Sequence, residues 1–216
     1  MKKIAIYGAG GFAREVAWLI SDITREDSDI RVACFIDDDE ANVGSIINNI
    51  PVLGWEQAVR QHPCMEVVVA IGSPKTRERI VDKVVQAGVP FATLIHPRVE
   101  MSELIEIGEG TIITTGNILT VNINIGQHVH INLDCTIGHD AILEDYVTLA
   151  PGVHISGWVH LERAVYIGTG AVIINGTSDK PIRIGSNAII GAGAVVTKDI
   201  PSGVTAVGMP AKPLKK

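Results

Sequence analysis

Residues 107–178 divide into blocks of six without a slip: IGEGTI, ITTGNI, LTVNIN, IGQHVH, INLDCT, IGHDAI, LEDYVT, LAPGVH, ISGWVH, LERAVY, IGTGAV and IINGTS. Every block begins with isoleucine or leucine, and the fifth residue is mostly small or β-branched, as at Thr111, Val129 and Ala171. A period of six fits neither an α-helix nor a simple alternating strand. It is typical of the hexapeptide β-helix, which we predict for this stretch.

Three blocks form one coil of a triangular prism, so that a coil takes ~18 residues and neighbouring coils stack at the ~4.8 Å spacing of strands. We expect the lead residue of each block to point inward, with the fifth residue filling the space beside it. Glycine often follows the lead residue, and we expect glycine or asparagine to turn the corners where φ is positive. A narrow core of this kind agrees with 4% aromatic against 46% hydrophobic residues.

Composition excludes several classes of function. The formal charge of −6 and the pI near 5.6 argue against a nucleic-acid polymer as partner. Cys34, Cys64 and Cys135 are odd in number and scattered, so we expect no disulfide framework and a cytoplasmic location. Residues 110–133 lack charged side chains, but their polar content and period of six argue against a membrane span.

The first 97 residues have a different pattern, with apolar strand-like runs alternating with helical segments. We predict strands at residues 2–7, 32–36, 67–71 and 91–95, an extended piece at 50–54, and helices after residue 11 and at 55–61 and 74–87. This alternation predicts a small parallel sheet. We therefore expect a Rossmann-like domain at 1–97 and the β-helix domain at 98–216.

The run GAGGFA at residues 8–13 lies between a predicted strand and a predicted helix, which is where glycines allow backbone to approach a phosphate. The second strand ends at Asp37-Asp38-Asp39, and an acidic residue at that point can accept hydrogen bonds from a ribose or a base. These features make the N-terminal domain a candidate nucleotide-binding domain. A nicotinamide-dependent enzyme is a weaker alternative, because nothing supplies a site for hydride transfer.

The hexads break after Ile173 and resume at Ile184, Ile190 and Val196. We predict a loop of about five extra residues within 175–181, because the composition NGTSDKP is polar. The tail, residues 204–216, is expected to cap the open end of the prism.

Five histidines lie within the hexads, but no two of them are about 18 or 36 residues apart, the separation needed to stack on one face. We therefore predict no metal site. His139 differs from the others because it is the third residue of its block, with an outward side chain, and Asp140 follows it. A neutral imidazole held by a carboxylate is suited to accept a proton from an attacking amine or hydroxyl.

Motifs along nearly the whole chain, in one order, resemble the family of sialic acid O-acetyltransferases and nucleotide-sugar 4-amino N-acetyltransferases. They are GAGGFAREV, FIDDD, IPVLG, VVVAIGS, LIHP, the hexads with INLDCTIGHD, IGTGAV, IGAGAVV and VGMPAK. The resemblance implies a Rossmann-like α/β domain followed by a left-handed parallel β-helix, forming a homotrimer with active sites between subunits. It also implies an acetyl-CoA-dependent transferase of a nucleotide sugar.

The resemblance assigns roles to individual residues. His139 would be the general base and Asp140 would raise its basicity, while Asn132 would lie near the sugar. Contacts to the nucleotide sugar would come from Gly10, Gly11, Phe12, Asp37, Asp38 and Gly72. The coenzyme A groove would be lined by Thr148, Gly168, Thr169 and Ala192. The sequence departs from the family pattern at Phe12, where many members have histidine or a small residue.

These observations lead to a hypothesis with two alternatives. The hypothesis is N-acetylation of the 4-amino group of a nucleotide-linked amino-dideoxy sugar, in one ternary complex, without a cysteine nucleophile. One alternative is O-acetylation of sialic acid or another sugar. The other is a non-catalytic module that binds a nucleotide sugar and oligomerises.

Overall fold

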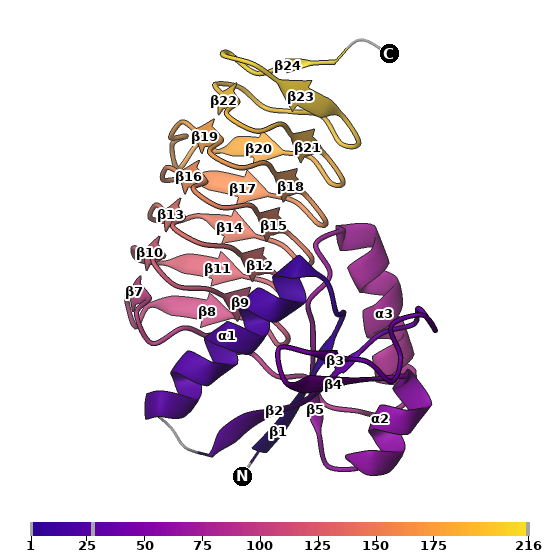
Figure 1. Cartoon of the computed structure of the whole chain (residues 1–216). Helices are drawn as coiled ribbons and strands as arrows, with labels where there is room; N and C mark the ends of the chain where they lie inside the picture. The colour runs from indigo at the N-terminus through magenta and orange to yellow at the C-terminus, as the bar shows by residue number, and fades with distance from the viewer. Residues whose placement is uncertain (1, 27–28, 215–216) are drawn as a thin grey trace. The chain divides into compact units, whose positions relative to one another are not determined.

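The computed structural model describes residues 2–26 and 29–214, and the chain divides into two compact units, residues 1–97 and 98–216 (Figure 1). The N-terminal unit is Rossmann-like, as predicted, with a central sheet in the order β3-β4-β2-β1-β5. Its elements are β1 (Lys2–Tyr7), α1 (Gly11–Glu26), β2 (Ile30–Ile36), β3 (Ile46–Ile47), β4 (Ile50–Leu53), α2 (Trp55–Gln61), β5 (Glu66–Val69), α3 (Pro74–Gln86) and β6 (Leu94–Ile95).

The sheet is parallel at β1, β2, β4 and β5, which confirms the prediction from the alternating pattern. β3 was not predicted, and it pairs antiparallel with β4 in a tight hairpin through Asn48 and Asn49, both at positive φ. The strand expected at residues 91–95 is shorter than predicted. Phe91 makes only an isolated bridge with Val67, and regular strand geometry is limited to Leu94–Ile95.

The helices of this unit follow from their sequence patterns. α1 buries Val16, Leu19 and Ile20 on one face, as its apolar spacing predicts. α3 begins after Ser73, whose hydroxyl oxygen accepts a hydrogen bond from the backbone N–H of Thr76, and it ends before Gly88 at φ 67°. Residues 8–10 connect β1 to α1, and residues 70–73 connect β5 to α3.

The C-terminal unit is a left-handed parallel β-helix. In Figure 1 the colour of its successive coils changes from magenta to yellow toward the C-terminus. Its strands are β7 (Glu100–Met101), β8 (Ile105–Ile107), β9 (Ile112–Ile113), β10 (Ile118–Leu119), β11 (Ile123–Ile125), β12 (His130–Ile131), β13 (Thr136–Ile137), β14 (Ile142–Leu143), β15 (Thr148–Leu149), β16 (His154–Ile155), β17 (Val159–Leu161), β18 (Tyr166–Ile167), β19 (Val172–Ile173), β20 (Ile182–Ile184), β21 (Ile189–Ile190), β22 (Val195–Val196), β23 (Thr205–Val207) and β24 (Lys212–Pro213).

Three parallel sheets form the faces of the prism. We call them face A (β7, β10, β13, β16, β19 and β22), face B (β8, β11, β14, β17 and β20) and face C (β9, β12, β15, β18, β21 and β23). Paired residues differ by 18, as in Ile118 with Thr136 and Ile142 with His160. After the loop at residues 174–181 the pairing of Leu161 with Ile184 differs by 23, which confirms five extra residues.

Burial confirms the two inward columns of the hexads. Every lead residue from Ile113 to Ile173 is buried, and so is every fifth residue from Thr111 to Ala171. The polar Asn117 fits this core because its amide donates to the Thr114 carbonyl oxygen and its Oδ1 accepts from the Cys135 N–H. Only the ends of the columns differ, since Ile107 is half-buried and Thr177 is exposed.

The prism begins and ends somewhat differently from the hexad pattern. It starts before Ile107, because Glu100 already pairs with Ile118 and Ile105 with Ile123. Met101, in the lead position of this first coil, is 38% exposed, which is why the hydrophobic pattern is weak there. At the other end β23 and β24 form an antiparallel hairpin on the last coil of face C; residues 215–216 of the expected cap lie outside the described residues.

The expectation that glycine or asparagine turns the corners at positive φ is confirmed at Gly110, Gly152 and Asn122, but the glycines that follow lead residues are not among these corner residues. Positive φ falls at the fourth residue of the block, where it is adopted by Gly110 and Gly152 but also by His128, Asp140 and Trp158. The glycines after the lead residue serve close packing between coils instead. A Cβ added at Gly126 would lie 2.6 Å from the Asp145 nitrogen, and Gly108, Gly138 and Gly168 are equally confined by the next coil.

Two glycine substitutions test this distinction between lack of space and backbone conformation. Gly126→Ala should lower the free energy of unfolding by about 1–3 kcal/mol, because the added methyl group meets the backbone of the next coil. Gly152→Asn should change it by less than ~0.5 kcal/mol, because asparagine tolerates positive φ and a Cβ there has no contact closer than 3.9 Å. Thermal and urea unfolding of the two variants measure the difference; equal destabilisation would contradict the packing role.

Candidate active site

His139 and Asp140 occupy the corner that joins β13 of face A to β14 of face B. The His139 side chain is 56% exposed, and its Nδ1 lies 2.7 Å from Oδ2 of Asp140. Asp140 has φ 58°, a left-handed conformation that aspartate tolerates. In this conformation its carboxylate contacts the imidazole of His139, the residue before it. When Nδ1–H donates to the carboxylate, Nε2 is left as the proton acceptor of a neutral imidazole.

Residues from neighbouring coils hold this histidine–aspartate pair. Asn122, one coil before Asp140, donates from Nδ2 to Asp140 Oδ1 over 3.2 Å. Gly157, one coil after His139, faces the imidazole so closely that an added Cβ would lie 2.5 Å from Cε1 and Nε2. The Trp158 ring meets the imidazole edge-on, with centroids 6.3 Å apart and an interplanar angle of 85°. The pair therefore depends on three consecutive coils.

Asn122 also lines a pocket of about 470 Å³ on the prism, together with Glu103, Leu104, Glu106 and Asn124. Within this pocket Asn124 donates from Nδ2 to Glu106 Oε2 over 3.2 Å. The pocket and the histidine–aspartate pair thus share one residue.

The residues assigned to the sugar and coenzyme lie on a different part of the prism. Asn132 follows β12 of face C, and its Nδ2 donates to the Leu149 carbonyl oxygen over 2.6 Å. Thr148 lies on face C and is 3% exposed, and Gly168 is also buried. Thr169 and Ala192 are exposed at successive coils of the corner that follows face C. His139 lies at a different corner, the one that follows face A. Within one chain, the residues assigned to the coenzyme and His139 are therefore on different edges of the prism.

The residues assigned to the nucleotide gather at one edge of the N-terminal sheet. β1 is flanked by β2 and β5, with Tyr7 paired to Ile36 and to Val69, so the segments after all three strands meet at their carboxyl ends. Gly8 has φ 115°, and a Cβ there would lie 2.9 Å from Cδ1 of Ile71. The predicted contacts at this edge are Gly10, Gly11, Phe12, Asp37, Asp38 and Gly72; Phe12 and Asp37 are half-buried and the others are exposed.

Asp37 and Asp38 already have partners within the chain. Asp37 accepts hydrogen bonds from the Asp39 backbone N–H and from Asn42 Nδ2. Asp38 Oδ1 accepts from the Tyr7 hydroxyl over 2.8 Å and from Lys83 Nζ over 2.9 Å. Both bonds to Asp38 fall on Oδ1, so its Oδ2 can accept from a ribose or a base.

Tyr7, Asp38 and Lys83 form a compact charged cluster, and the Trp55 ring stacks on Tyr7 at 5.7 Å. Burial raises the pKa of Tyr7 to about 12, so its hydroxyl stays protonated at neutral pH. Burial alone would raise the pKa of Asp38, but hydrogen bonds from Lys83 and Tyr7 lower it. The same bonds raise the pKa of Lys83 against the opposing effect of burial. At neutral pH the cluster therefore holds one carboxylate and one ammonium.

Four residues of these sites were not predicted from the sequence: Tyr7, Trp55, Lys83 and Asn122. Asn122 could have been found from the sequence, because it precedes Asp140 by 18 residues, which is one coil of the prism. Tyr7 was harder to find, and its only indication is that it is the last residue of the strand before the glycine turn. Nothing in the sequence indicates Lys83 and Trp55, because only the fold of the N-terminal unit brings them to Tyr7.

Cys135 is buried inside the prism. Burial raises the pKa of the Cys135 thiol to about 11, so it is not a thiolate nucleophile at neutral pH. Within residues 2–26 and 29–214, no three His, Cys, Asp or Glu side chains are grouped to hold a metal ion.

Comparisons with known proteins bear on both units. Residues 3–84 match the family model of the PglD N-terminal domain. The whole chain is 36% identical, over 98% of the relative's length, to GDP-perosamine N-acetyltransferase of Escherichia coli. The chain belongs to this acetyltransferase family.

Two solved structures of acetyltransferases have the same fold along the full chain. The acetyltransferase domain of PglB from Neisseria gonorrhoeae, in complex with acetyl coenzyme A, is 30% identical with a TM-score of 0.86, over 99% of each chain. PerB from Caulobacter crescentus, in complex with CoA and GDP-perosamine, is 28% identical with a TM-score of 0.85, over 100% of this chain and 98% of that chain. The acetyltransferase family is thus matched in both units and in their order.

Gly157→Ala tests how closely the prism holds His139. The added methyl group would overlap Cε1 and Nε2, so the imidazole must move away from its position beside Asp140. Because Gly157 is not at positive φ, alanine adds no backbone strain. We expect acetyl transfer to fall by about 10²-fold, as for a misplacement of ~1 Å at a reacting group. Thiol release measures the rate; an unchanged rate in a folded variant would contradict the close placement of His139.

Proposed function

We propose that this protein transfers the acetyl group of acetyl-CoA to the 4-amino group of a nucleotide-linked amino-dideoxy sugar, with His139 as general base. The observation that carries the proposal is the 2.7 Å contact between His139 Nδ1 and Asp140 at an exposed corner of the β-helix. GDP-perosamine is the first acceptor to test, because a relative along the full chain is a GDP-perosamine N-acetyltransferase.

In the proposed reaction the neutral amine attacks the thioester carbonyl while Nε2 of His139 takes the proton that the nitrogen loses. Asp140 stabilises the imidazolium that forms. The carbon–sulfur bond then breaks, and the proton taken up by His139 passes to the leaving thiolate, which becomes the free thiol of CoA and leaves His139 neutral. Backbone N–H groups at the prism corners would stabilise the negative oxygen of the attacked carbonyl. Transfer is direct, because Cys135 is buried and its pKa is raised.

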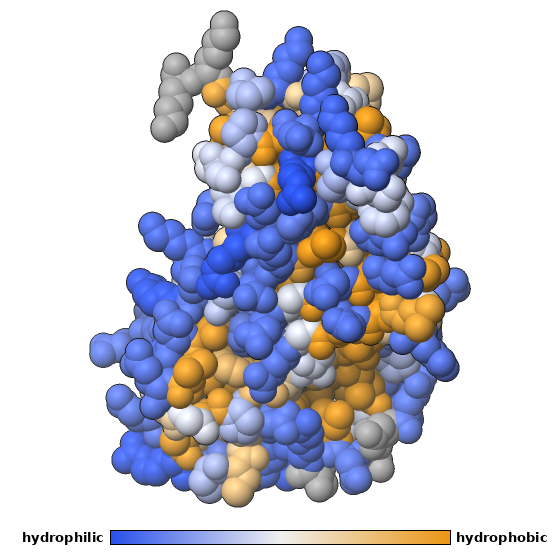
Figure 2. Space-filling model, turned by 180° about the vertical axis from the view of Figure 1, so that it is seen from behind, coloured by the Kyte–Doolittle hydropathy of each residue, from blue (hydrophilic) through white to orange (hydrophobic). Residues whose placement is uncertain are grey.

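We also propose a homotrimer with the acetyl-transfer site between adjacent prisms. His139 lies at the corner after face A, whereas Thr169 and Ala192 lie at the corner after face C, so a second copy is needed to combine them. Each prism face exposes an isoleucine that association would cover: Ile118 on face A, Ile142 on face B and Ile189 on face C, all 41–45% exposed. Figure 2 shows apolar patches that interrupt the polar surface on one side of the molecule.

The N-terminal unit is the proposed nucleotide-sugar domain, through Gly10, Gly11, Phe12, Asp38 and Gly72. Asp37 would act mainly by shaping the loop, since its oxygens already bind Asp39 and Asn42. We place the reaction in the cytoplasm, where acetyl-CoA and nucleotide sugars are available. None of the helices in residues 2–26 and 29–214 is long and apolar enough to cross a membrane.

Variants of the proposed base and its partner test the mechanism. His139→Ala should lower kcat by about 10²- to 10⁴-fold, because the proton of the attacking amine loses its acceptor. Asp140→Asn should lower it less, since asparagine keeps the left-handed turn but not the negative charge. CoA thiol release is measured with GDP-, UDP- and dTDP-linked 4-amino-4,6-dideoxy sugars and with free sialic acid.

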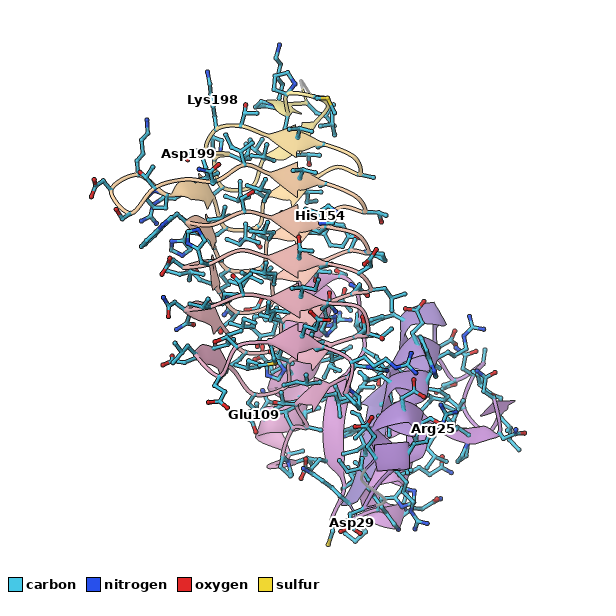
Figure 3. All side chains as sticks on the ribbon, turned by 90° about the vertical axis from the view of Figure 1, so that its left-hand side faces the viewer. Arg25, Asp29, Glu109, His154, Lys198 and Asp199 are labelled. Carbon is cyan, nitrogen blue, oxygen red and sulfur yellow. The ribbon has the colours of Figure 1, made fainter. Side chains whose placement is uncertain are left out.

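His154→Ala is the matched control for these variants. His154 is an exposed histidine on β16 of face A, and its Nδ1 lies 2.9 Å from the Thr136 hydroxyl rather than near a carboxylate (Figure 3). His154 stands in the same outward column of face A as Ile118, so the oligomeric state of the variant is measured first. With that state unchanged, we expect wild-type activity. Activity with sialic acid alone would support the O-acetyltransferase alternative, and full activity of folded His139→Ala would refute the proposed base.

A further inference from the structure

Asn122 lies one coil before the proposed catalytic pair and contacts Asp140. It occupies the coil before Asp140, and both residues have left-handed backbone conformations, at φ 56° and 58°. Its amide nitrogen donates to Asp140 Oδ1, while Oδ2 of the same carboxylate meets His139 Nδ1. The two carboxylate oxygens are therefore divided between an amide on one side and the imidazole on the other.

We propose that Asn122 is a positioning residue that sets the orientation and the ring tautomer of His139 through Asp140. This inference rests on the proposed function of His139 as the general base. By holding Oδ1, Asn122 keeps the carboxylate from rotating about its last side-chain bond, so Oδ2 stays in line with Nδ1–H. The proton is thereby kept on Nδ1, and Nε2 stays free to accept the proton of the substrate amine.

The chemistry of an amide suits this role better than a charged side chain would. Lysine or arginine at this position would form an ion pair with Asp140 and reduce the negative charge felt by the imidazolium. Aspartate would repel Asp140 and push the carboxylate away. A neutral donor orients the carboxylate and leaves its charge available to His139. Asparagine also tolerates the positive φ that the corner requires.

Two variants separate the hydrogen bond from the shape of the corner. Asn122→Gly keeps the left-handed conformation and removes the donor, so we expect kcat to fall about fivefold to tenfold, the effect of one partly exposed hydrogen bond to a charged group. Asn122→Asp keeps the size of the side chain but replaces the hydrogen-bond donor to Asp140 with a carboxylate that repels it. A second carboxylate favours the protonated ring, so the acid limb of the pH–rate profile should move to higher pH.

Asn187→Gly is the matched control. Asn187 is also an exposed asparagine at positive φ, 59°, but it lies at the corner after face B, whereas His139 and Asp140 lie at the corner after face A. It should have wild-type activity and a wild-type pH profile. If both glycine variants lose activity equally, the effect belongs to the corners in general and the inference is overturned.

Nitrogen-15 NMR of protein labelled at histidine supplies a readout that needs no acceptor. The inference predicts that the neutral ring of His139 carries its proton on Nδ1 in the wild type, and that Asn122→Gly gives a mixture of the two tautomers. An unchanged tautomer in Asn122→Gly would overturn it. If His139→Ala is fully active while the tautomer shifts as predicted, the general-base proposal fails and the positioning role of Asn122 stands.

Discussion

Backbone hydrogen bonds between successive coils of the prism are the constraint on which the rest of this structure depends. They place residues 18 positions apart directly over one another, as in the pairing of Thr136 with His154. The same regularity stacks Asn122 with Asp140, and His139 with Gly157. The proposed catalytic pair lies in one coil, and the coils before and after it each supply a contact that holds it.

The same stacking sets a severe limit on side-chain volume at the corners. The position after the lead residue leaves no room for a Cβ at Gly108, Gly126, Gly138 and Gly168. At the fourth position the backbone is left-handed, and aspartate, histidine and tryptophan occur there. A Cβ would have space at Gly152 and Gly170, although at Gly110 it would meet the His128 ring. Polar side chains can therefore occupy that position, and Asp140, which is proposed to be catalytic, is one of them.

The N-terminal unit follows a different principle, in which the carboxyl ends of parallel strands bring loops together. Here the ion pair of Asp38 with Lys83, both partly exposed, is worth little to stability by itself. The ion pair instead fixes the orientation of the Asp38 carboxylate, because Tyr7 and Lys83 both donate hydrogen bonds to its Oδ1. The carboxylate is thus held at the edge of the sheet where a nucleotide would bind.

Much of this arrangement could be predicted from the sequence, because its period is local. The hexads predicted the inward columns, the five-residue loop and the outward His139 next to Asp140, and the glycine turn predicted the first strand and helix. The interactions of Tyr7 with Lys83 could not be predicted, since the two residues are 76 positions apart and no repeat relates them. The true role of the glycines after the lead residues was also hidden, because a sequence does not show how closely two backbones approach.

The most direct test of the account is a crystal structure of the wild-type protein with CoA and GDP-perosamine. We expect the amine nitrogen of the sugar to lie within hydrogen-bond reach of His139 Nε2, about 2.6–3.2 Å, with Nδ1 still bound to Asp140. We also expect the CoA sulfur to lie on the same side of the ring. An amine bound at another corner of the prism, with His139 facing only solvent, would contradict the account.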